Sequence, residues 1–182
     1  MALATAPGYL ESMNEQQTAS YEKLVEYLKK TEPPHDYGRL LLWTSTRIAH
    51  LLSPEEQAKL VQMILKHQRS DGGWSLRTFA TPESWGSGNR AEKLRSEPEF
   101  ENPRSDGHQT GLALIVLLEA GVAVDDPRIQ RGVEWLKNNQ RESGRWWTRS
   151  LNNDRFHFIT YSGTVYPLLA LAKAGALPKA NE

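Results

Sequence analysis

The chain has 182 residues, with 22 lysine plus arginine, 22 aspartate plus glutamate and no cysteine, so its formal net charge is zero. This length is typical of one domain with one core. The balanced charge argues against a nucleic-acid backbone or an anionic membrane surface as a partner. The lack of cysteine excludes disulfides, cysteine-ligated zinc and thiolate nucleophiles.

The N-terminal residues contain no basic stretch followed by an apolar one, so no secretory signal is visible and a cytoplasmic location is favoured. The longest apolar run, residues 111–120, contains Glu119 and is about half of the roughly 20 residues that a membrane-spanning helix needs. We therefore expect no transmembrane segment.

Amphipathic and more apolar segments alternate along the chain, in the order outer, inner, outer, inner, outer, inner. The amphipathic segments begin near Lys23, at Ser53 and at Asp126, and the apolar ones occupy residues 38–52, 110–121 and 162–175. Ser53 and Asp126 each precede a proline, which is typical of a helix start. An amphipathic helix has a wet face, whereas a helix that is apolar all round is enclosed by others. The pattern predicts an all-α fold with an outer and an inner layer. Pro167 in the last apolar segment predicts a kink or a first helical turn there.

Two segments repeat at a spacing of 72 residues. The first reads KLVQMILKHQRSDGGW and ends at Trp74, and the second reads RGVEWLKNNQRESGRW and ends at Trp146. Their shared positions are Lys59/Arg131, Gln68/Gln140, Gly72/Gly144 and Trp74/Trp146. A weaker copy, KLVEYL from Lys23, has Glu32 at the glutamine position and lacks the glycine and the tryptophan.

The segment 75–105 is polar, rich in proline and glycine, and too long for an ordinary connection inside a compact domain. We predict an irregular insertion here. A solvated loop is the favoured interpretation. A lid is the alternative, because Trp85 and Phe100 are apolar side chains that can close over a pocket.

The second copy resembles the repeat of squalene-hopene cyclases and of the wider terpenoid cyclase/prenyltransferase superfamily. That repeat is a basic residue, a small residue, an aromatic-aliphatic pair, then glutamine, glycine and tryptophan. Every position is matched by Arg131, Gly132, Trp135, Leu136, Gln140, Gly144 and Trp146. The first copy departs from it, with Leu60 at the small position and Met63 at the aromatic one.

This resemblance covers roughly residues 21–175, apart from the insertion. It implies a partial α/α toroid of about six helices, with residues 1–182 forming a single domain. It also implies a structural role for the six residues of the glutamine-tryptophan (QW) motif. In that family the glutamine caps the start of a neighbouring outer helix and the tryptophan stacks on it. These residues are Gln68, Gly72, Trp74, Gln140, Gly144 and Trp146.

The residues that the superfamily uses for its two catalytic chemistries, alkene protonation and zinc-dependent prenyl transfer, are absent from this chain. Cyclases that protonate an alkene use an Asp-x-Asp-Asp motif, but Ala123 stands at the first aspartate position before Asp125 and Asp126. Asp126 is better explained as a helix cap. Protein prenyltransferases hold zinc with aspartate, cysteine and histidine, and the chain has no cysteine. We predict no cofactor and no metal site, and we assign no catalytic residue.

Six polar residues lie near the expected starts of inner helices, where a toroid opens, and are candidates for the mouth of a cavity. They are His35, Asp36, Asp106, His108, His157 and Tyr161. Converging there, they can act as metal ligands or as acid/base pairs. The favoured interpretation is that Asp106 and Thr160 cap helices and that the histidines are exposed loop residues.

Six helices are fewer than the ten to fourteen of the family's closed ring, so we expect an uncovered apolar face. Further toroid repeats, a partner subunit or self-association can cover it. The favoured function is a toroid module, not catalytic alone, that binds an apolar, isoprenoid-like ligand or a protein partner. The alternative is a segment or subunit of a triterpene cyclase, an isomerase whose proton donor lies outside this chain. In that case Trp43, Tyr161 and Tyr166 are aromatic wall residues, although packing in the core is the favoured interpretation of these side chains.

Overall fold

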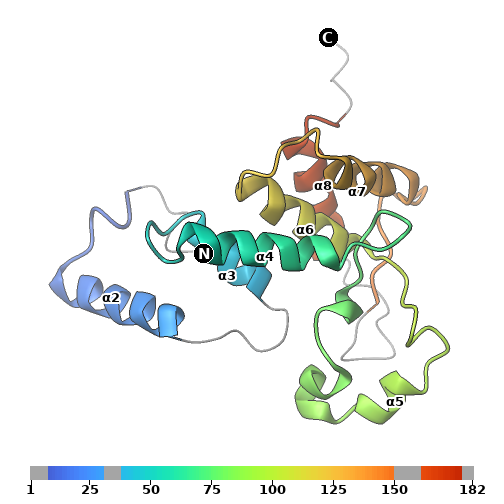
Figure 1. Cartoon of the computed structure of the whole chain (residues 1–182), viewed down its shortest axis with the longest axis horizontal. Helices are drawn as coiled ribbons and strands as arrows, with labels where there is room; N and C mark the ends of the chain where they lie inside the picture. The colour runs from blue at the N-terminus through green and yellow to red at the C-terminus, as the bar shows by residue number, and fades with distance from the viewer. Residues whose placement is uncertain (1–7, 31–37, 150–160, 178–182) are drawn as a thin grey trace.

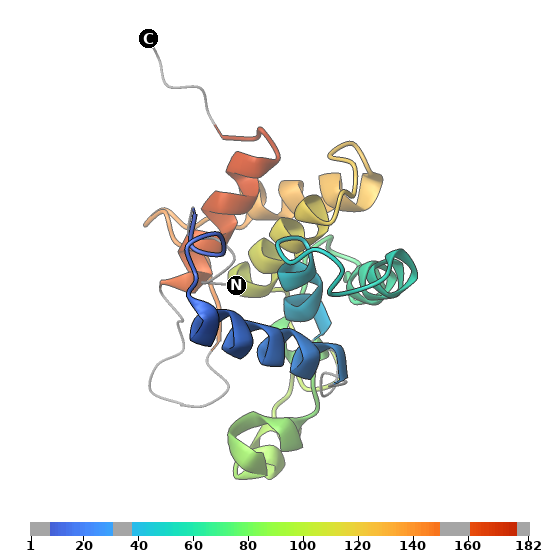
Figure 2. The ribbon, with the colours of Figure 1, turned by 90° about the vertical axis from the view of Figure 1, so that its left-hand side faces the viewer.

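The computed structural model describes residues 8–30, 38–149 and 161–177, which form helices and turns and contain no strand. The α-helices of these residues are α2 (Glu15–Lys30), α3 (Gly38–Ser45), α4 (Pro54–Lys66), α5 (Ala91–Arg95), α6 (Gly107–Glu119), α7 (Pro127–Asn138) and α8 (Ser162–Lys173). Two 3₁₀-helices, η2 (Leu76–Thr78) and η3 (Pro82–Gly88), precede α5. Helices α3, α4, α6, α7 and α8 form one body, and α2 and α5 project from it (Figure 1; Figure 2).

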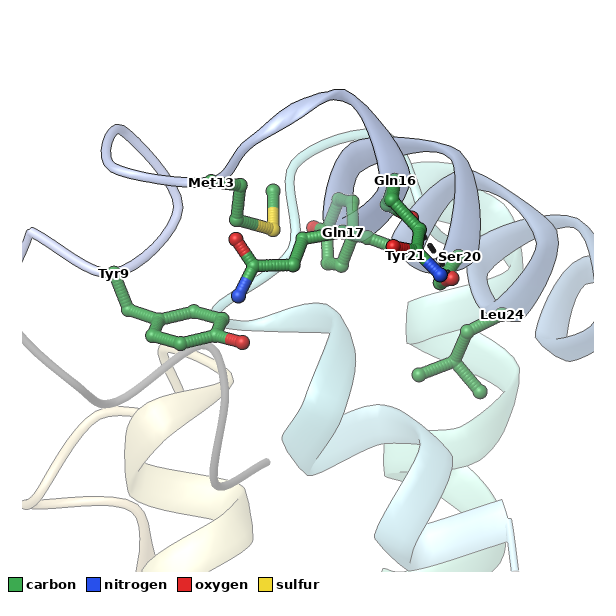
Figure 3. Close-up of a pocket in the computed structure, with 7 residues that line it drawn as sticks. All are labelled: Tyr9, Met13, Gln16, Gln17, Ser20, Tyr21 and Leu24. Atoms are coloured by element: carbon green, nitrogen blue, oxygen red, sulfur yellow. Dashed lines mark hydrogen bonds between the residues drawn. The ribbon is translucent and has the colours of Figure 1, made fainter.

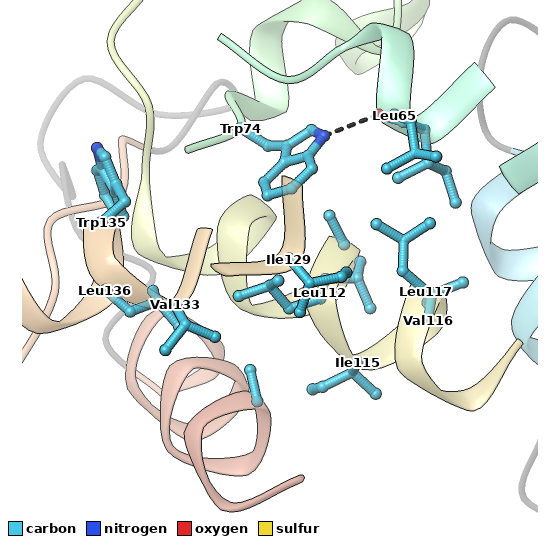
Figure 4. Close-up of a cluster of buried hydrophobic side chains, with 14 of the residues drawn as sticks. Leu65, Trp74, Leu112, Ile115, Val116, Leu117, Ile129, Val133, Trp135 and Leu136 are labelled. Atoms are coloured by element: carbon cyan, nitrogen blue, oxygen red, sulfur yellow. Dashed lines mark hydrogen bonds between the residues drawn. The ribbon is translucent and has the colours of Figure 1, made fainter. Parts of the chain in front are cut away.

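Helix α6 lies at the centre of this body and packs against α3, α4, α7 and α8. Its residues from Leu112 to Leu117 are all buried, as expected for a sequence that is apolar on every side. The surrounding helices contribute Ile64, Ile129 and Leu136 to the same core, which Figure 4 shows in close-up. The inner helices α3, α6 and α8 and the outer helices α4 and α7 confirm the predicted partial α/α toroid.

Two glycines bring α6 and α8 into close contact. A Cβ atom on Gly111 would lie 2.4 Å from the backbone nitrogen of Pro167, and one on Gly107 would lie 2.9 Å from the carbonyl oxygen of Gly163. Both distances are shorter than a side chain can tolerate. Pro167 lies inside α8 rather than in its first turn. Its ring therefore packs directly against the α6 backbone.

The outer helices begin where the sequence predicts. Ser53 and Glu56 form a reciprocal capping box at the start of α4, with hydrogen bonds of 3.2 and 2.7 Å. At α7, the Asp126 carboxylate accepts hydrogen bonds from the backbone and the guanidinium of Arg128. The side chain and then the backbone of Arg128 lower the pKa of Asp126 to about 2. The carboxylate is therefore ionised and complements the positive end of the helix.

The insertion, residues 75–105, contains η2, η3 and α5 and has a small apolar cluster of its own, made of Leu76, Leu94 and Trp85. Glu97 forms ion pairs with Arg77, at 3.0 Å, and with Arg149. Burial lowers the pKa of Arg77, and the neighbouring Arg149 lowers it further, while Glu97 opposes both. These three charges attach the insertion to the segment that follows Trp146. The role of a lid stays a prediction.

Candidate functional site

The first QW turn, residues 68–74, joins α4 to α7. Gln68 donates from Nε2 to the carbonyls of Gly72, at 2.8 Å, and Arg128, at 2.7 Å, and its Oε1 accepts from the Arg131 guanidinium at 2.9 Å. Gly72 has a φ of +92°, which a glycine adopts without strain. The indole of Trp74 is fully buried and donates to the carbonyl of Ile64 at 2.8 Å.

This turn therefore reaches the start of the next outer helix, as the resemblance implies, but by different bonds. The Gln68 nitrogen donates to a carbonyl in the first turn of α7, whereas the N–H groups there are capped by Asp126. A further bond, which the sequence analysis did not anticipate, links Asp71 to Trp135 at 3.1 Å. Asp71 also accepts from Ser105 at 2.7 Å, so it joins the turn to both α7 and the end of the insertion.

The second QW turn, residues 140–146, repeats the internal bonds of the first. Gln140 donates to the carbonyl of Gly144 at 3.0 Å, and Trp146 donates to that of Leu136 at 2.8 Å. Gly144 has a φ of +77°. Gln140 is exposed, however, and within the described part of the chain no helix start lies against its amide.

The convergence of the candidate cavity-mouth residues stays a prediction, because only three of the six lie in the part of the chain that the structure describes. His35, Asp36 and His157 lie outside the described residues. Asp106 is buried and accepts from the backbone N–H groups of Gln109, at 2.8 Å, and Leu76, at 2.7 Å, so it caps α6. Tyr161 is 80% exposed. Over the described ranges, no group of three histidine, aspartate or glutamate side chains is placed to hold a metal ion.

His108 is the candidate that meets other polar and aromatic groups. Its Nδ1 lies 2.9 Å from the hydroxyl of Ser162, and its ring centre lies 5.2 Å from that of Tyr166. Tyr166 in turn lies 6.4 Å from Trp43, edge to face. Trp43, Tyr166 and His108, which we call the aromatic row, come from α3, α8 and α6 and are all half-buried. The row gives the inner layer a band of ring faces and edges.

The Glu119 cluster, made of Trp43, Arg47, Glu119 and Lys173, joins the last turns of the inner helices. The Glu119 carboxylate accepts from the Trp43 indole at 3.0 Å and from Arg47 at 2.7 Å, and it forms an ion pair with Lys173 at 2.7 Å. Burial raises the pKa of Glu119, but the bonds from Lys173, Arg47 and Trp43 together hold it below its usual value. The group is therefore ionised, and it orients the indole at one end of the aromatic row.

The alternating inner and outer helical layers define the class of this protein, an all-α fold of the partial α/α toroid type. The family model described as the squalene-hopene cyclase C-terminal domain matches residues 8–176. The chain belongs to that family and thus to the terpenoid cyclase superfamily. Within the described residues, none of the helices combines the length and the apolar character that crossing a membrane requires.

Curated relatives support this assignment. A probable squalene-hopene cyclase of Sinorhizobium fredii is 32% identical over 129 residues, which cover 68% of this chain and 18% of the relative. A squalene-hopene cyclase of Bradyrhizobium diazoefficiens is 28% identical over 175 residues, covering 86% of this chain and 24% of the relative. The matched part thus spans about a fifth to a quarter of the relatives' own length. No solved structure gives a significant match.

Proposed function

We propose that this chain is a single-domain toroid module, not catalytic alone, that binds an apolar, isoprenoid-like ligand along its inner helices. The observation that carries this proposal is the aromatic row. Three rings from three different helices lie in a row, with ring centres 5.2 and 6.4 Å apart, and none of the three residues is fully buried. Ring faces attract methyl and alkene groups through dispersion and attract cationic centres through the ring quadrupole.

The surroundings of the row hold its rings in place. Tyr166 is held from behind by the close contact of α8 with Gly111. Trp43 is oriented by its bond to Glu119. These contacts orient both rings before a ligand binds, which reduces the conformational entropy lost on binding.

A binding experiment tests this proposal with farnesol as the probe and dodecanol as a linear control of similar polarity. We expect the wild-type chain to bind farnesol more tightly than dodecanol, and Tyr166→Leu to weaken farnesol binding about tenfold, which is about 1.4 kcal/mol. The matched control is Tyr9→Leu, because Tyr9 lines a separate hollow beside α2. Loss of binding in Tyr9→Leu but not in Tyr166→Leu would place the ligand at α2 and refute the proposal.

A second candidate is a segment or subunit of a squalene-hopene-type triterpene cyclase, an isomerase. The relatives' printed names and the family match favour it. In such a protein the aromatic row would stabilise cationic intermediates, and the proton donor would have to come from outside this chain. Asp126 is unsuited to that task, because its low pKa leaves it without a proton at neutral pH and both its oxygens are engaged by Arg128.

The two candidates differ in what the coding sequence contains and in what the chain does alone. A reading frame that continues upstream into further glutamine-tryptophan repeats and an Asp-x-Asp-Asp segment would support the cyclase. A frame that begins at Met1, or that continues into an unrelated domain, would support the binding module. Squalene incubated with the 182-residue chain should yield no cyclic product under either candidate. Product formation would refute the absence of a proton donor.

A further inference from the structure

One side of α8 is exposed in the described part of the chain. We propose that two copies of this chain associate reciprocally, with α2 of each copy packing against α8 of the other. Helix α8 packs on α6 and α7, and its buried residues are Gly163, Pro167, Ala170 and Leu171. Its other side carries Val165, Leu168 and Leu169, and the two leucines are 41% and 47% exposed. Within the described residues no outer helix lies over this side.

The two QW turns show what kind of element belongs there. The first turn binds the start of the outer helix that follows it in the layer, through the bonds of Gln68 to α7. The second turn has the same internal bonds, but among the described residues its Gln140 bonds only to Gly144. One amide hydrogen and the amide oxygen of Gln140 have no partner in this part of the chain. The second turn is therefore preformed for an outer helix that would also cover α8.

Helix α2 has the properties of that missing outer helix. It is amphipathic, with Tyr21, Leu24, Val25 and Leu28 along one stripe, and none of its residues is buried. Leu24 is 41% exposed. The segment KLVEYL aligns with RGVEWL of α7, which places Lys23 where Arg131 donates to the glutamine of the first turn. Lys23 of a second copy can donate to Gln140 in the same way.

A hollow beside α2 provides room for leucine side chains. It has a volume of about 380 Å³ and is lined by Tyr9, Met13 and Leu24, among others. Figure 3 shows Tyr9 and Leu24 at opposite ends of it, with Gln17 between them. The lining mixes apolar side chains with the polar Gln16, Gln17 and Ser20, and its apolar part suits the exposed leucines of α8 from a second copy.

One position limits how closely this contact copies the first turn. A Cβ atom on Gly132 would lie 2.7 Å from the Trp74 ring, and α2 has Leu24 at the matching position. Helix α2 therefore cannot approach the second turn as closely as α7 approaches the first. The apolar contact with Leu168 and Leu169 has to supply most of the affinity, with Gln140 as a polar anchor.

Symmetry makes the pairing closed. Each copy offers one α2 and one α8, so a two-fold dimer contains two identical contacts and leaves neither face exposed. In each copy, α2 of the partner then covers α8 in the same way that α7 covers α6. This inference is independent of the ligand proposed above.

Light scattering and sedimentation of the purified full chain at several concentrations test the proposal. The head variant is Leu24→Asp and the tail variant is Leu169→Asp. The matched control is Val124→Asp, because Val124 is an apolar residue with 44% exposure away from both faces. All three sites are exposed, so folding should persist, and circular dichroism checks it. We expect a concentration-dependent dimer for the wild type and the control, and dissociation constants raised at least about tenfold for the head and tail variants.

A mixture of the two variants gives the sharpest readout. In the mixed dimer, α8 of the Leu24→Asp copy meets α2 of the Leu169→Asp copy, and this one of the two contacts is unchanged. Mixing should therefore restore part of the association that each variant alone has lost. A monomeric wild type would overturn the proposal and leave α8 for another segment or protein to cover. An effect of Leu169→Asp without any effect of Leu24→Asp would also overturn it, because it would indicate pairing of α8 with α8.

Discussion

The Glu119 cluster is the best place to measure how the inner helices are held together. The substitution Glu119→Gln keeps the shape of the side chain and removes its charge. A glutamine oxygen can still accept from Trp43 and Arg47, but its NH₂ group then faces the Lys173 ammonium, which is also a donor. The change therefore removes both ion pairs, leaving neutral hydrogen bonds to Trp43 and Arg47 and none to Lys173.

The expected loss follows from the burial of the partners. A hydrogen bond to a charged group contributes about 1.5–3 kcal/mol. The Glu119 side chain is 9% exposed, but those of Arg47 and Lys173 are 41% and 39% exposed. The two cations regain hydration when the carboxylate is lost, which reduces the penalty. We expect the free energy of unfolding to fall by about 2 kcal/mol, equivalent to about 4–8 °C in melting temperature for a chain of this size.

The effect should depend on pH in one direction. The pKa of Glu119 is lower in the folded chain than its ordinary value, so its stabilisation is present above the unfolded pKa and is lost as pH falls through the folded pKa. Urea unfolding followed by tryptophan fluorescence should show the full difference between wild type and Glu119→Gln at pH 7, and a smaller one below about pH 4. The control Glu101→Gln, at an exposed position, should change stability by less than about 0.5 kcal/mol. Equal stabilities of the two variants at pH 7 would refute the reasoning.

Two matched pairs test the QW turns by the same unfolding measurement. Gly72→Ala should lower the free energy of unfolding by about 3 kcal/mol, because φ is +92° and the new Cβ would lie 2.8 Å from the Arg131 carbonyl oxygen. Gly121→Ala, where φ is +85° and the space is open, should lower it by about 1 kcal/mol. Equal losses of stability in the two variants would show that the close approach of Gly72 to α7 does not contribute to the effect. Gln68→Ala should lower the free energy of unfolding by about 2 kcal/mol, because three hydrogen bonds are lost. Gln140 is exposed and makes one bond, so Gln140→Ala should lower the stability of the monomer by less than about 0.5 kcal/mol. The reverse order would contradict the assignment of partners.

The helical layers were predictable because their signals are local. Serine or aspartate followed by proline specifies the start of α4 and α7, and the difference between amphipathic and wholly apolar segments separates outer from inner helices. The boundaries of α6 and α8 differ from the prediction by a few residues, since each helix ends shortly before a glycine, Gly121 or Gly175, that takes a positive φ after the C-cap.

The contacts between helices were not predictable from the same signals. The aromatic row depends on which inner helices are neighbours, which periodicity does not reveal. A signal for the Glu119 cluster was present, because a carboxylate at the end of an apolar run needs a cationic partner when it is buried. Another signal was the spacing of Gly107 and Gly111, which places two glycines on one face of α6.

In the insertion, the sequence analysis underestimated the amount of regular structure. Its polar composition favoured a solvated loop, but short helices form in it because Leu94 and Trp85 pack on Leu76 and because Glu97 finds two arginines. Arg149, one of those arginines, lies more than 40 residues along the chain from the insertion's end, so no local pattern could have paired them.

The glycine contact between α6 and α8 also determines where the inner surface is able to change its width. The backbones of the two helices are in direct contact at Gly111 and Pro167, so α6 and α8 cannot shift against each other and must move as a unit. Helix α3 meets that unit through side chains, chiefly Trp43 and Arg47 on Glu119. Any adjustment to a larger or smaller guest would therefore occur by displacement of α3, and the adaptable part of the wall would be its tryptophan side.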